Sequence, residues 1–388
     1  MIASSITSEM ETKKLVFVID TLQTGGAEKS TLEIATRLRN QFEVYVVTVY
    51  FFDHLNSLVI DYPHLKYIHL DIKGKYQFRQ AYKKMRILFS QIQPSLVVAT
   101  LYRAEITSRL VCLKMRIPNV GTFVNDTYSP YELESLNFIQ KLKIGFFWIL
   151  NFVTARFCIG FLANSNSIKN SNSKALFIKL QKIHVIPRGR DLNYFVPNSK
   201  GTNREEFVFV TVGRLLERKG HVELIEAFAR IEKSFPNARL YIAGEGPFRM
   251  TLENKIAAYS LDGKVTLLGN VRDVNGLLQQ ADIFVFPSWY EGFSGALVEA
   301  MLAGVPIIAS NIEMNKEAVR HRETAYLFEV RDVKAIENAM DFAISENAKM
   351  REFAVAAGIE AKKRFDIEKI AEEHAKFYNS ITSKPTYV

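Results

Sequence analysis

Short continuous runs of apolar residues alternate with longer amphipathic segments along nearly all of the 388-residue chain. An apolar run of five or six residues, bounded by turn residues, is typical of a strand buried on both faces of a parallel sheet. The segments between these runs, such as 28–39 and 76–92, have the spacing of helices that cover a sheet. The expected strands are 15–19, 44–49, 95–100, 119–124 and 158–163 in the first half, and 207–213, 239–246, 264–269, 282–288 and 305–310 in the second.

This alternation is interrupted between residues 188 and 206, where Pro, Asn, Ser and Gly accumulate. Such a break between two β-α series is typical of a linker, and the chain is long enough for two cores. We therefore predict an α/β protein with two doubly wound domains facing a central cleft, where ligands bind beyond the carboxyl ends of the strands. The expected parts are a flexible tail (1–13), two domains (14–190 and 191–366), and a C-terminal helix (367–388) that can cross back to the first domain.

Charge is divided unequally between the two halves. Residues 1–190 hold 25 basic and 13 acidic residues, a net +12, whereas residues 191–388 hold 25 and 28, a net −3. The segment from Ser135 to Arg190 has nine basic residues and no acidic one, and it contains the aromatic run 143–163. Such a mixture suits nucleic acid or an anionic membrane surface, but no nucleic-acid-binding motif is present. Two interpretations remain open: residues 137–155 form a core helix, or their face docks on lipid.

Several classes of site are excluded by composition. The two cysteines, Cys112 and Cys158, are too few for a disulfide framework or a thiolate metal site. The chain has no D-x-D motif, no H-E-x-x-H motif and no clustered pair of histidines, so we expect no metal site. The N-terminal residues lack the apolar core of a signal peptide, which favours a cytoplasmic location.

Gly25 and Gly26 follow the first predicted strand, and a Lys-Ser pair comes shortly after them in TGGAEKS. This order resembles a P-loop, whose pattern is G-x-x-x-x-G-K-[ST]. Neither glycine of that pattern is in place, and Glu28 puts negative charge where the phosphate would lie. We therefore reject the P-loop and interpret the glycines as a tight turn that lets a ligand approach the helix behind it.

Cations and glycines also follow the strands of the second half. Gly213 ends one predicted strand, and Arg214 and Lys219 come after it in GRLLERKG. Two cations at the carboxyl end of a strand suit a diphosphate, although a solvated loop has the same composition. Gly244 follows the next strand in AGEGP, where a flat ligand such as a nucleobase can approach the backbone.

Two glutamates, Glu291 and Glu299, flank a turn into a helix in EGFSGALVE. The free amides at such a helix start suit phosphate. Eight residues are about two helical turns, roughly 10 Å, so both carboxylates can face one cleft. This separation suits two contacts with one extended ligand better than a shared metal ion. Two surface glutamates beside a helix start remain the alternative.

In this order the motifs resemble the GT-B glycosyltransferases, specifically the retaining group called glycosyltransferase family 4. The resemblance covers about residues 14–380 and also includes ANS, VIPRGRDLNYF and EAMLAGVPIIAS. It implies two Rossmann-like domains, no cofactor, and a nucleotide diphosphate sugar as donor, with UDP the most frequent nucleotide. Together with the basic segment, it leads us to expect a lipid-linked or cell-envelope glycan as acceptor, at the inner face of the cell membrane.

The resemblance also implies roles for individual residues. Arg214 and Lys219 would hold the donor diphosphate, Glu299 the ribose, and Glu291 the hydroxyls of the transferred sugar. Catalysis would then depend on positioning and charge stabilisation by Glu291, Arg214 and Lys219, and a hexosyl or N-acetylhexosaminyl group would keep its configuration. The other residues expected at the donor are Gly25, Gly26, Gly213, Gly244, Gly292, Phe293, Ser294 and Gly295, of which the first two approach from the acceptor side.

Departures from the family pattern concern mainly the acceptor. Asn125 and Asp126 stand where many relatives have a histidine, so no histidine is assigned a role. Asp126 either contacts the acceptor or caps its loop. Arg188-Gly189-Arg190-Asp191 replaces the frequent Asn-Gly-Val-Asp, and Asn315-Lys316 replaces the glycine before Glu317.

Two rival functions remain. The first is a nucleotide-sugar epimerase or hydrolase on the same fold, and the second is a non-catalytic protein that binds a nucleotide or a glycan.

Overall fold

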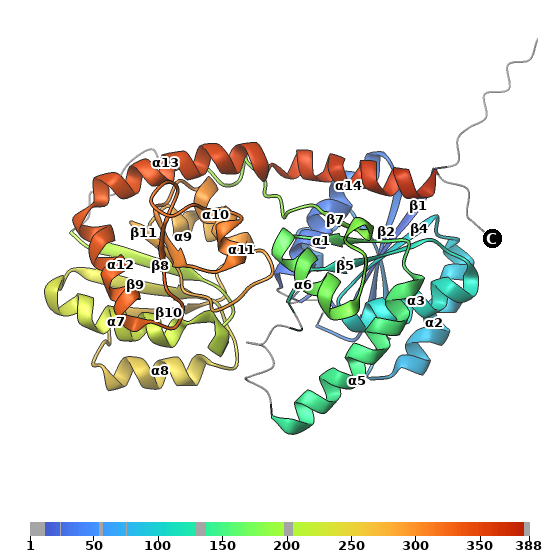
Figure 1. Cartoon of the computed structure of the whole chain (residues 1–388), viewed down its shortest axis with the longest axis horizontal. Coiled ribbons are helices and arrows are strands. Elements are labelled where there is room, and N and C mark those ends of the chain that lie inside the picture. The colour runs from blue at the N-terminus through green and yellow to red at the C-terminus, as the bar shows by residue number, and fades with distance from the viewer. Residues whose placement is uncertain are drawn as a thin grey trace, which may run out of the picture.

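A computed structural model describes residues 12–23, 25–53, 57–74, 76–126, 128, 137–197 and 205–383. It contains two domains side by side, each built on one parallel sheet, with helices on both faces (Figure 1). The predicted pair of doubly wound Rossmann-like domains is therefore confirmed. The expected tail over residues 1–13 lies, apart from its last two residues, outside the described residues.

The first domain has a seven-stranded sheet in the order β3-β2-β1-β4-β5-β6-β7. On the third strand of this order, Val16 and Val18 face one hydrophobic cluster, while Leu15, Phe17 and Ile19 face another. Because both faces are buried, the strand appears in the sequence as an unbroken apolar run. The elements are β1 (Lys14–Ile19), β2 (Glu43–Tyr50), β3 (Lys66–Ile72), β4 (Leu96–Thr100), β5 (Asn119–Phe123), β6 (Gly160–Ala163) and β7 (Ile183–Val185), with helices α1 (Gly26–Arg37), α2 (Phe78–Ile92), α3 (Tyr102–Met115), α5 (Phe138–Thr154) and α6 (Asn166–Leu176).

The second domain has a six-stranded sheet in the order β10-β9-β8-β11-β12-β13, again with an apolar cluster on each face. Its strands are β8 (Phe207–Val212), β9 (Ala238–Ala243), β10 (Val265–Gly269), β11 (Ile283–Phe286), β12 (Ile307–Ser310) and β13 (Tyr326–Phe328). Its helices are α7 (His221–Ser234), α8 (Arg249–Ala258), α9 (Val274–Leu278), α10 (Gly295–Leu302), α11 (Glu313–Lys316), α12 (Val333–Ser345) and α13 (Asn347–Arg364).

Three strands were not predicted: β3, β7 and β13, and each lies at an edge of its sheet. An edge strand is covered less completely than a central one, so its residues need not all be apolar. In β3 the residues Lys66 and Asp71 are exposed, and this breaks the run. The strands β7 and β13 have three residues each, which is too short for a periodic signal.

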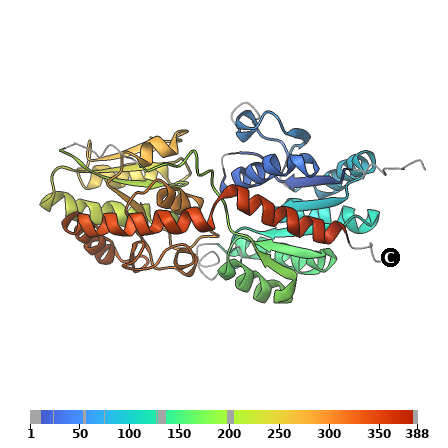
Figure 2. The ribbon, with the colours of Figure 1, turned by 90° about the horizontal axis from the view of Figure 1, so that it is seen from above.

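The last helix, α14 (Ile367–Thr382), leaves the second domain and covers the first (Figure 2). Ile370 and Tyr378 join the cluster formed by Leu15 and Phe17, and the rings of Phe17 and Tyr378 meet edge to face at 6.2 Å. The first domain therefore takes part of its core from the end of the chain.

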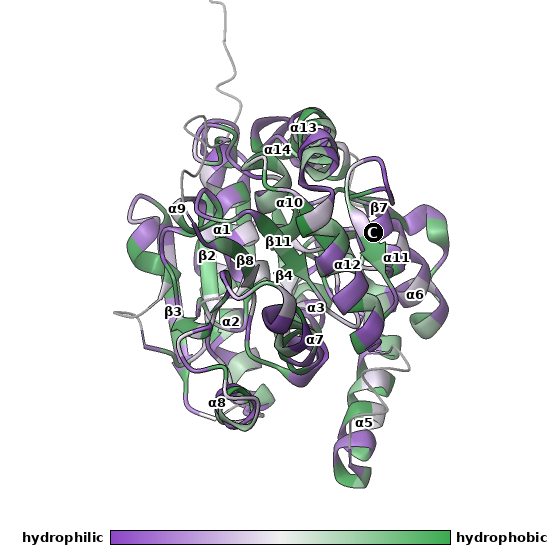
Figure 3. Ribbon diagram, turned by 90° about the vertical axis from the view of Figure 1, so that its left-hand side faces the viewer, coloured by the Kyte–Doolittle hydropathy of each residue, from purple (hydrophilic) through white to green (hydrophobic). Residues whose placement is uncertain are grey.

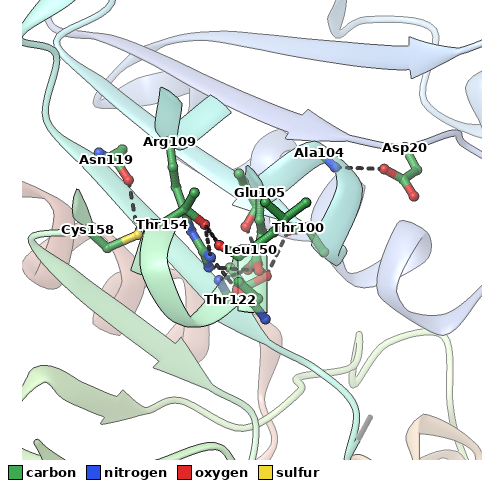
Figure 4. Close-up of polar contacts among 12 residues, drawn as sticks. Asp20, Thr100, Ala104, Glu105, Arg109, Asn119, Thr122, Leu150, Thr154 and Cys158 are labelled. Atoms are coloured by element: carbon green, nitrogen blue, oxygen red, sulfur yellow. Dashed lines mark hydrogen bonds and ion pairs between the residues drawn. The ribbon is translucent and has the colours of Figure 1, made fainter. Parts of the chain in front are cut away.

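A buried polar network fixes the base of α5 (Figure 4). The Arg109 guanidinium pairs with Glu105 at 2.8 Å, and the other Glu105 oxygen accepts the Thr122 amide at 2.7 Å. Arg109 also donates to the side chains of Asn151 and Thr154 on α5. The polar residues that interrupt this apolar helix therefore satisfy a charge pair that would be costly to bury alone.

The rest of α5 projects from the first domain (Figure 3). Many of its large apolar side chains are exposed to solvent. Its buried residues are Asn151 and Thr154, whereas Phe138 is 75% exposed, Leu142 60% and Phe146 58%. The helix was predicted correctly. The interpretation of its apolar residues as core holds only in part, because Trp148 and Phe152 pack against a hydrophobic cluster of the first domain while other apolar residues of the helix are exposed. The exposed apolar residues of α5, here called the α5 stripe, are Phe138, Ile139, Leu142, Phe146, Ile149 and Val153.

Glu317 of the second domain caps a helix of the first. Its carboxylate accepts the backbone amides of Asn166 and Ser167, both at 2.7 Å, while Ser165 accepts the amide of Ile168 at 3.1 Å. Three free amides of the first turn of α6 are thus satisfied, two of them by the other domain.

We expect Glu317→Ala to loosen the contact between the domains, because a lost cap of this kind costs about 1 kcal/mol. Small-angle scattering should show a larger radius of gyration than for the wild type. Glu313→Ala is the matched control, since Glu313 is an exposed glutamate of α11 whose ion pair with Lys316 stays inside that helix. Equal radii for Glu317→Ala and Glu313→Ala would contradict the expectation.

Candidate functional site

The two domains touch where the loops after their parallel strands meet. A Cβ atom on Gly292 would lie 2.0 Å from the carbonyl oxygen of Val124, which directly follows β5. The side-chain amide of Asn164, which follows β6, donates to the same carbonyl at 3.0 Å. Glycine at position 292 is therefore needed for this close approach, and both sheets present their carboxyl ends to one place.

Lys219 and Glu291 form an ion pair in the second domain. Lys219 lies in a short 3-10 turn (Glu217–Lys219), and the Trp289 amide donates to the Arg218 carbonyl at 2.8 Å, which holds the two loops together. The side chains of Lys219 and Glu291 are 13% and 12% exposed. Burial alone would raise the pKa of Glu291, but Lys219 and Arg218 outweigh it and lower that pKa. The carboxylate is therefore ionised and accepts hydrogen bonds.

Two glycines, Gly213 and Gly244, lie at the ends of the strands next to this pair. A Cβ on Gly213 would lie 3.7 Å from Lys219 Nζ. Gly244 has φ of 138°, and a Cβ there would lie 1.9 Å from the Gly213 carbonyl oxygen, so both the conformation and the space require glycine. Arg214 follows Gly213 and is exposed. The structure thus brings Gly213, Arg214, Lys219 and Gly244 together at the ends of β8 and β9.

His221 lies beside this pair, although no histidine was assigned a role from the sequence. It is 2% exposed at the start of α7, directly after Gly220. Burial, and then the Lys219 cation, lower its pKa to about 3, although Glu291 acts in the opposite direction. His221 is therefore neutral at physiological pH and adds no charge to this loop.

Glu299 lies on the first turns of α10, as expected, but other charges already contact it. Its Oε1 atom is 2.7 Å from Arg190 Nε and 3.5 Å from Lys29 Nζ. The Ser294 hydroxyl caps α10 by accepting the Leu297 amide at 3.4 Å. Arg190 is one of the departures from the family pattern, and no role was predicted for it.

Phe293 and Gly295 also have structural tasks at this helix start. Phe293 is 3% exposed and packs against Phe365, with the ring centres 5.4 Å apart. A Cβ on Gly295 would lie 1.9 Å from Arg190 Nη2, so the guanidinium occupies the space that a side chain would take.

The glycine pair begins α1 on the side of the first domain. Gly25 is the N-cap and offers no side chain to the free amides. The carboxylate of Glu28 folds back beside Gly25, and burial raises its pKa despite the nearby Arg188 and Arg214. A Cβ on Gly26 would lie 2.7 Å from Arg188 Nη1. Because Arg214 belongs to the second domain, its effect on Glu28 places charges of both domains near this turn.

Asn125 and Asp126 are bonded within the first domain. The Ser171 hydroxyl donates to Asp126, and the Asn172 side chain donates to the Asn125 carbonyl at 3.4 Å. Both partners belong to α6. These bonds are those of a loop tied to a helix, the second of the two roles considered for Asp126.

Within the described ranges, no three His, Cys, Asp or Glu side chains are grouped so that they could hold a metal ion.

Comparisons with known proteins agree with this arrangement. Residues 24–194 match the family model of glycosyltransferase family 4, and residues 195–363 match that of glycosyl transferases group 1. The crystal structure of Anabaena HepE in complex with UDP and glucose superposes with a TM-score of 0.82, covering 95% of this chain and 100% of that one, at 21% identity. At that identity the likeness shows the fold.

Two curated relatives match the chain over about half of their length. UDP-Gal:alpha-D-GlcNAc-diphosphoundecaprenol alpha-1,3-galactosyltransferase of Escherichia coli is 31% identical over 213 residues, 52% of this chain and 55% of that protein. Phosphatidyl-myo-inositol mannosyltransferase of Mycobacterium leprae is 29% identical over 209 residues, again 52% and 55%. With both halves matched by family models and the fold shared along nearly the whole chain, the protein belongs to the GT-B glycosyltransferases of family 4.

Proposed function

We propose that the protein transfers a sugar from a nucleotide diphosphate sugar, with a UDP-sugar favoured, to a lipid-linked or cell-envelope glycan, with retention of configuration and without a metal ion. The observation that carries this proposal is the Lys219–Glu291 ion pair next to Gly213 and Gly244, at the ends of β8 and β9. It offers a cation for a diphosphate and an ionised carboxylate for sugar hydroxyls at adjacent positions.

The pair suggests how the donor is received. When a diphosphate reaches Lys219 and Arg214, it replaces Glu291 as the partner of the Lys219 ammonium group. Glu291, kept ionised by its surroundings, then accepts hydrogen bonds from the hydroxyls of the transferred sugar. The acceptor oxygen bonds to the anomeric carbon as the bond to the diphosphate breaks, and the leaving diphosphate takes the acceptor proton. The protein contributes orientation and charge rather than a nucleophile.

The relatives support the choice of donor and acceptor. The name of the Escherichia coli relative gives UDP-Gal as donor and a diphosphoundecaprenol-linked sugar as acceptor, and that of the Mycobacterium leprae relative gives a phosphatidylinositol. The Anabaena structure holds UDP and glucose. A UDP-sugar and a lipid-linked acceptor are therefore the first pair to assay.

The α5 stripe supports a place at a membrane surface. No helix in the described part of the chain is both long and apolar enough to cross a bilayer. The stripe nevertheless presents large apolar side chains to solvent next to Lys141 and Lys143, in a segment without acidic residues. A helix of this kind lies in the interface of an anionic bilayer, and the proposal is that α5 holds the first domain at the inner face of the membrane.

We expect one nucleoside diphosphate among UDP, GDP and ADP to raise the melting temperature of the wild type, and Lys219→Ala to abolish the shift. At about 100 times its dissociation constant a ligand adds roughly 2.7 kcal/mol, which corresponds to a few degrees. Thermal-shift measurements test this, with Lys233→Ala, an exposed lysine at the far end of α7, as control. Because Lys219→Ala leaves Glu291 without its cation, Lys219→Ala/Glu291→Gln is measured as well.

The rival functions predict different results when donor consumption is assayed on the same purified protein. A hydrolase or epimerase consumes the donor equally fast with and without acceptor, whereas a transferase needs the acceptor. A non-catalytic binder shows the thermal shift but turns over no pair of donor and acceptor.

We expect the wild type to float with liposomes that contain anionic lipid, and Leu142→Glu/Phe146→Glu to bind at least tenfold less, because each substitution removes about 1.5–3 kcal/mol of apolar burial. Val355→Glu/Ile359→Glu on α13 is the matched control, since those side chains are 65% and 68% exposed on the other domain. Flotation of the α5 variant with the same yield as the control would refute the role of the α5 stripe.

A further inference from the structure

Arg190 joins three separate parts of the chain through one guanidinium. It lies in the linker, is 2% exposed, and its Nε donates to Glu299 of α10 at 2.7 Å. Its Nη1 lies 3.2 Å from Glu33 of α1 and also donates to the Gly189 carbonyl at 2.8 Å. The carboxylate expected to hold the donor ribose is therefore connected, through Arg190, to a carboxylate of the first domain.

The surroundings are built to hold this guanidinium in one orientation. The Arg190 amide donates to the Phe365 carbonyl at 2.8 Å, and the Arg190 carbonyl accepts the Ile367 amide at 3.2 Å. Gly295 leaves out the Cβ that would collide with Nη2. A planar guanidinium can donate along two directions at fixed angles, which a lysine ammonium group cannot reproduce.

The ion pairs at this place join two cations with two carboxylates. Arg190 and Lys29 are the cations, and Glu33 and Glu299 are the carboxylates. Lys29 and Arg190 both lie closest to the same oxygen of Glu299, Oε1, at 3.5 and 2.7 Å. A carboxylate has a second oxygen, and Oε2 of Glu299 can accept hydrogen bonds from a ligand while the ion pairs of Oε1 persist.

We propose that Arg190 is a positioning residue for the donor: it holds Glu299 so that Oε2 faces the ribose hydroxyls, and Glu33 fixes Arg190 from the first domain. This inference rests on the proposed function, because it takes Glu299 as the ligand of the ribose. It makes recognition of the ribose depend on the contact between the domains, since Glu33 belongs to one and Glu299 to the other.

The alternative is that Arg190 only ties the domains together. In that case removing it lowers stability or weakens all nucleotides equally. A role in positioning Glu299 instead changes the preference for ribose hydroxyls, so the ratio of affinities for a nucleotide and its deoxy analogues separates the two.

The experiment is a calorimetric titration with the nucleoside diphosphate that stabilises the wild type most, UDP in the first instance, and with its 2′-deoxy and 3′-deoxy analogues. Hydrogen bonds to a charged group correspond to roughly ten- to hundredfold in affinity, so the wild type should prefer the ribonucleotide to at least one analogue by that factor. Arg190→Met should bring the ratio close to one, as should Glu299→Gln in large part. Arg190→Lys and Glu33→Gln should give intermediate ratios.

Arg37→Met is the matched control. Arg37 pairs with Glu368 at 2.7 Å and with Asp191 of the linker at 3.6 Å, so it also ties the linker to the first domain but does not contact Glu299. It should leave the ratio unchanged. If Arg190→Met does not fold, the test is made with Glu33→Gln. This substitution removes the negative charge that pairs with Arg190 and leaves both Arg190 and Glu299 in place.

The outcomes separate this inference from the proposed function. A ratio in Arg190→Met and Glu33→Gln equal to that of the wild type overturns the positioning role and leaves donor binding intact. A wild type that binds the diphosphate without any preference for ribose hydroxyls overturns it too, and again leaves the proposed function standing. A wild type that binds no nucleoside diphosphate removes both.

Discussion

The arrangement of the two domains depends on one place where two segments of the chain that connect the domains lie side by side. The linker passes from the first domain to the second, and the junction of α13 and α14 returns beside it. The two segments are joined by backbone hydrogen bonds of Arg190 with Phe365 and Ile367. A Cβ on Gly189 would lie 2.7 Å from the Ile367 Cα, so the close contact of the segments requires glycine there. Because α14 then completes the core of the first domain, the position of each domain is set by this short pairing.

Paired charges fill the space that a donor would enter. Glu291 is paired with Lys219, and Glu299 with Arg190 and Lys29, so each carboxylate is stabilised before any ligand arrives. An anionic ligand that binds here replaces a glutamate as the partner of one of these cations. The cation is therefore paired both before and after the ligand binds. This lowers the cost of the exchange, because an uncompensated buried charge is far more expensive than a replaced one.

The strands inside both sheets could be predicted because they are apolar on both faces, and the edge strands β3, β7 and β13 could not, for want of that signal. Among the residues selected from motifs, Lys219 and Glu291 meet within one domain, where sequence order along a β-α unit already places strand ends together. Arg190 could not be assigned in this way. Its partners lie 109 and 157 residues away, on helices of different domains, and their approach depends on how the domains dock.

The exposed apolar residues of α5 illustrate the same limit. Apolar composition predicts burial, but not what covers the side chain. The polar residues at the base of the helix bond to Arg109, which pairs with Glu105 in the interior. The α5 stripe lies beyond this network, and no element among the described residues covers it. The stripe and the excess positive charge both belong to the first domain, whereas the Lys219–Glu291 pair belongs to the second. A donor that diffuses in solution and an acceptor held at a surface would thus approach from different domains, and they would meet where Gly292 touches the chain after β5.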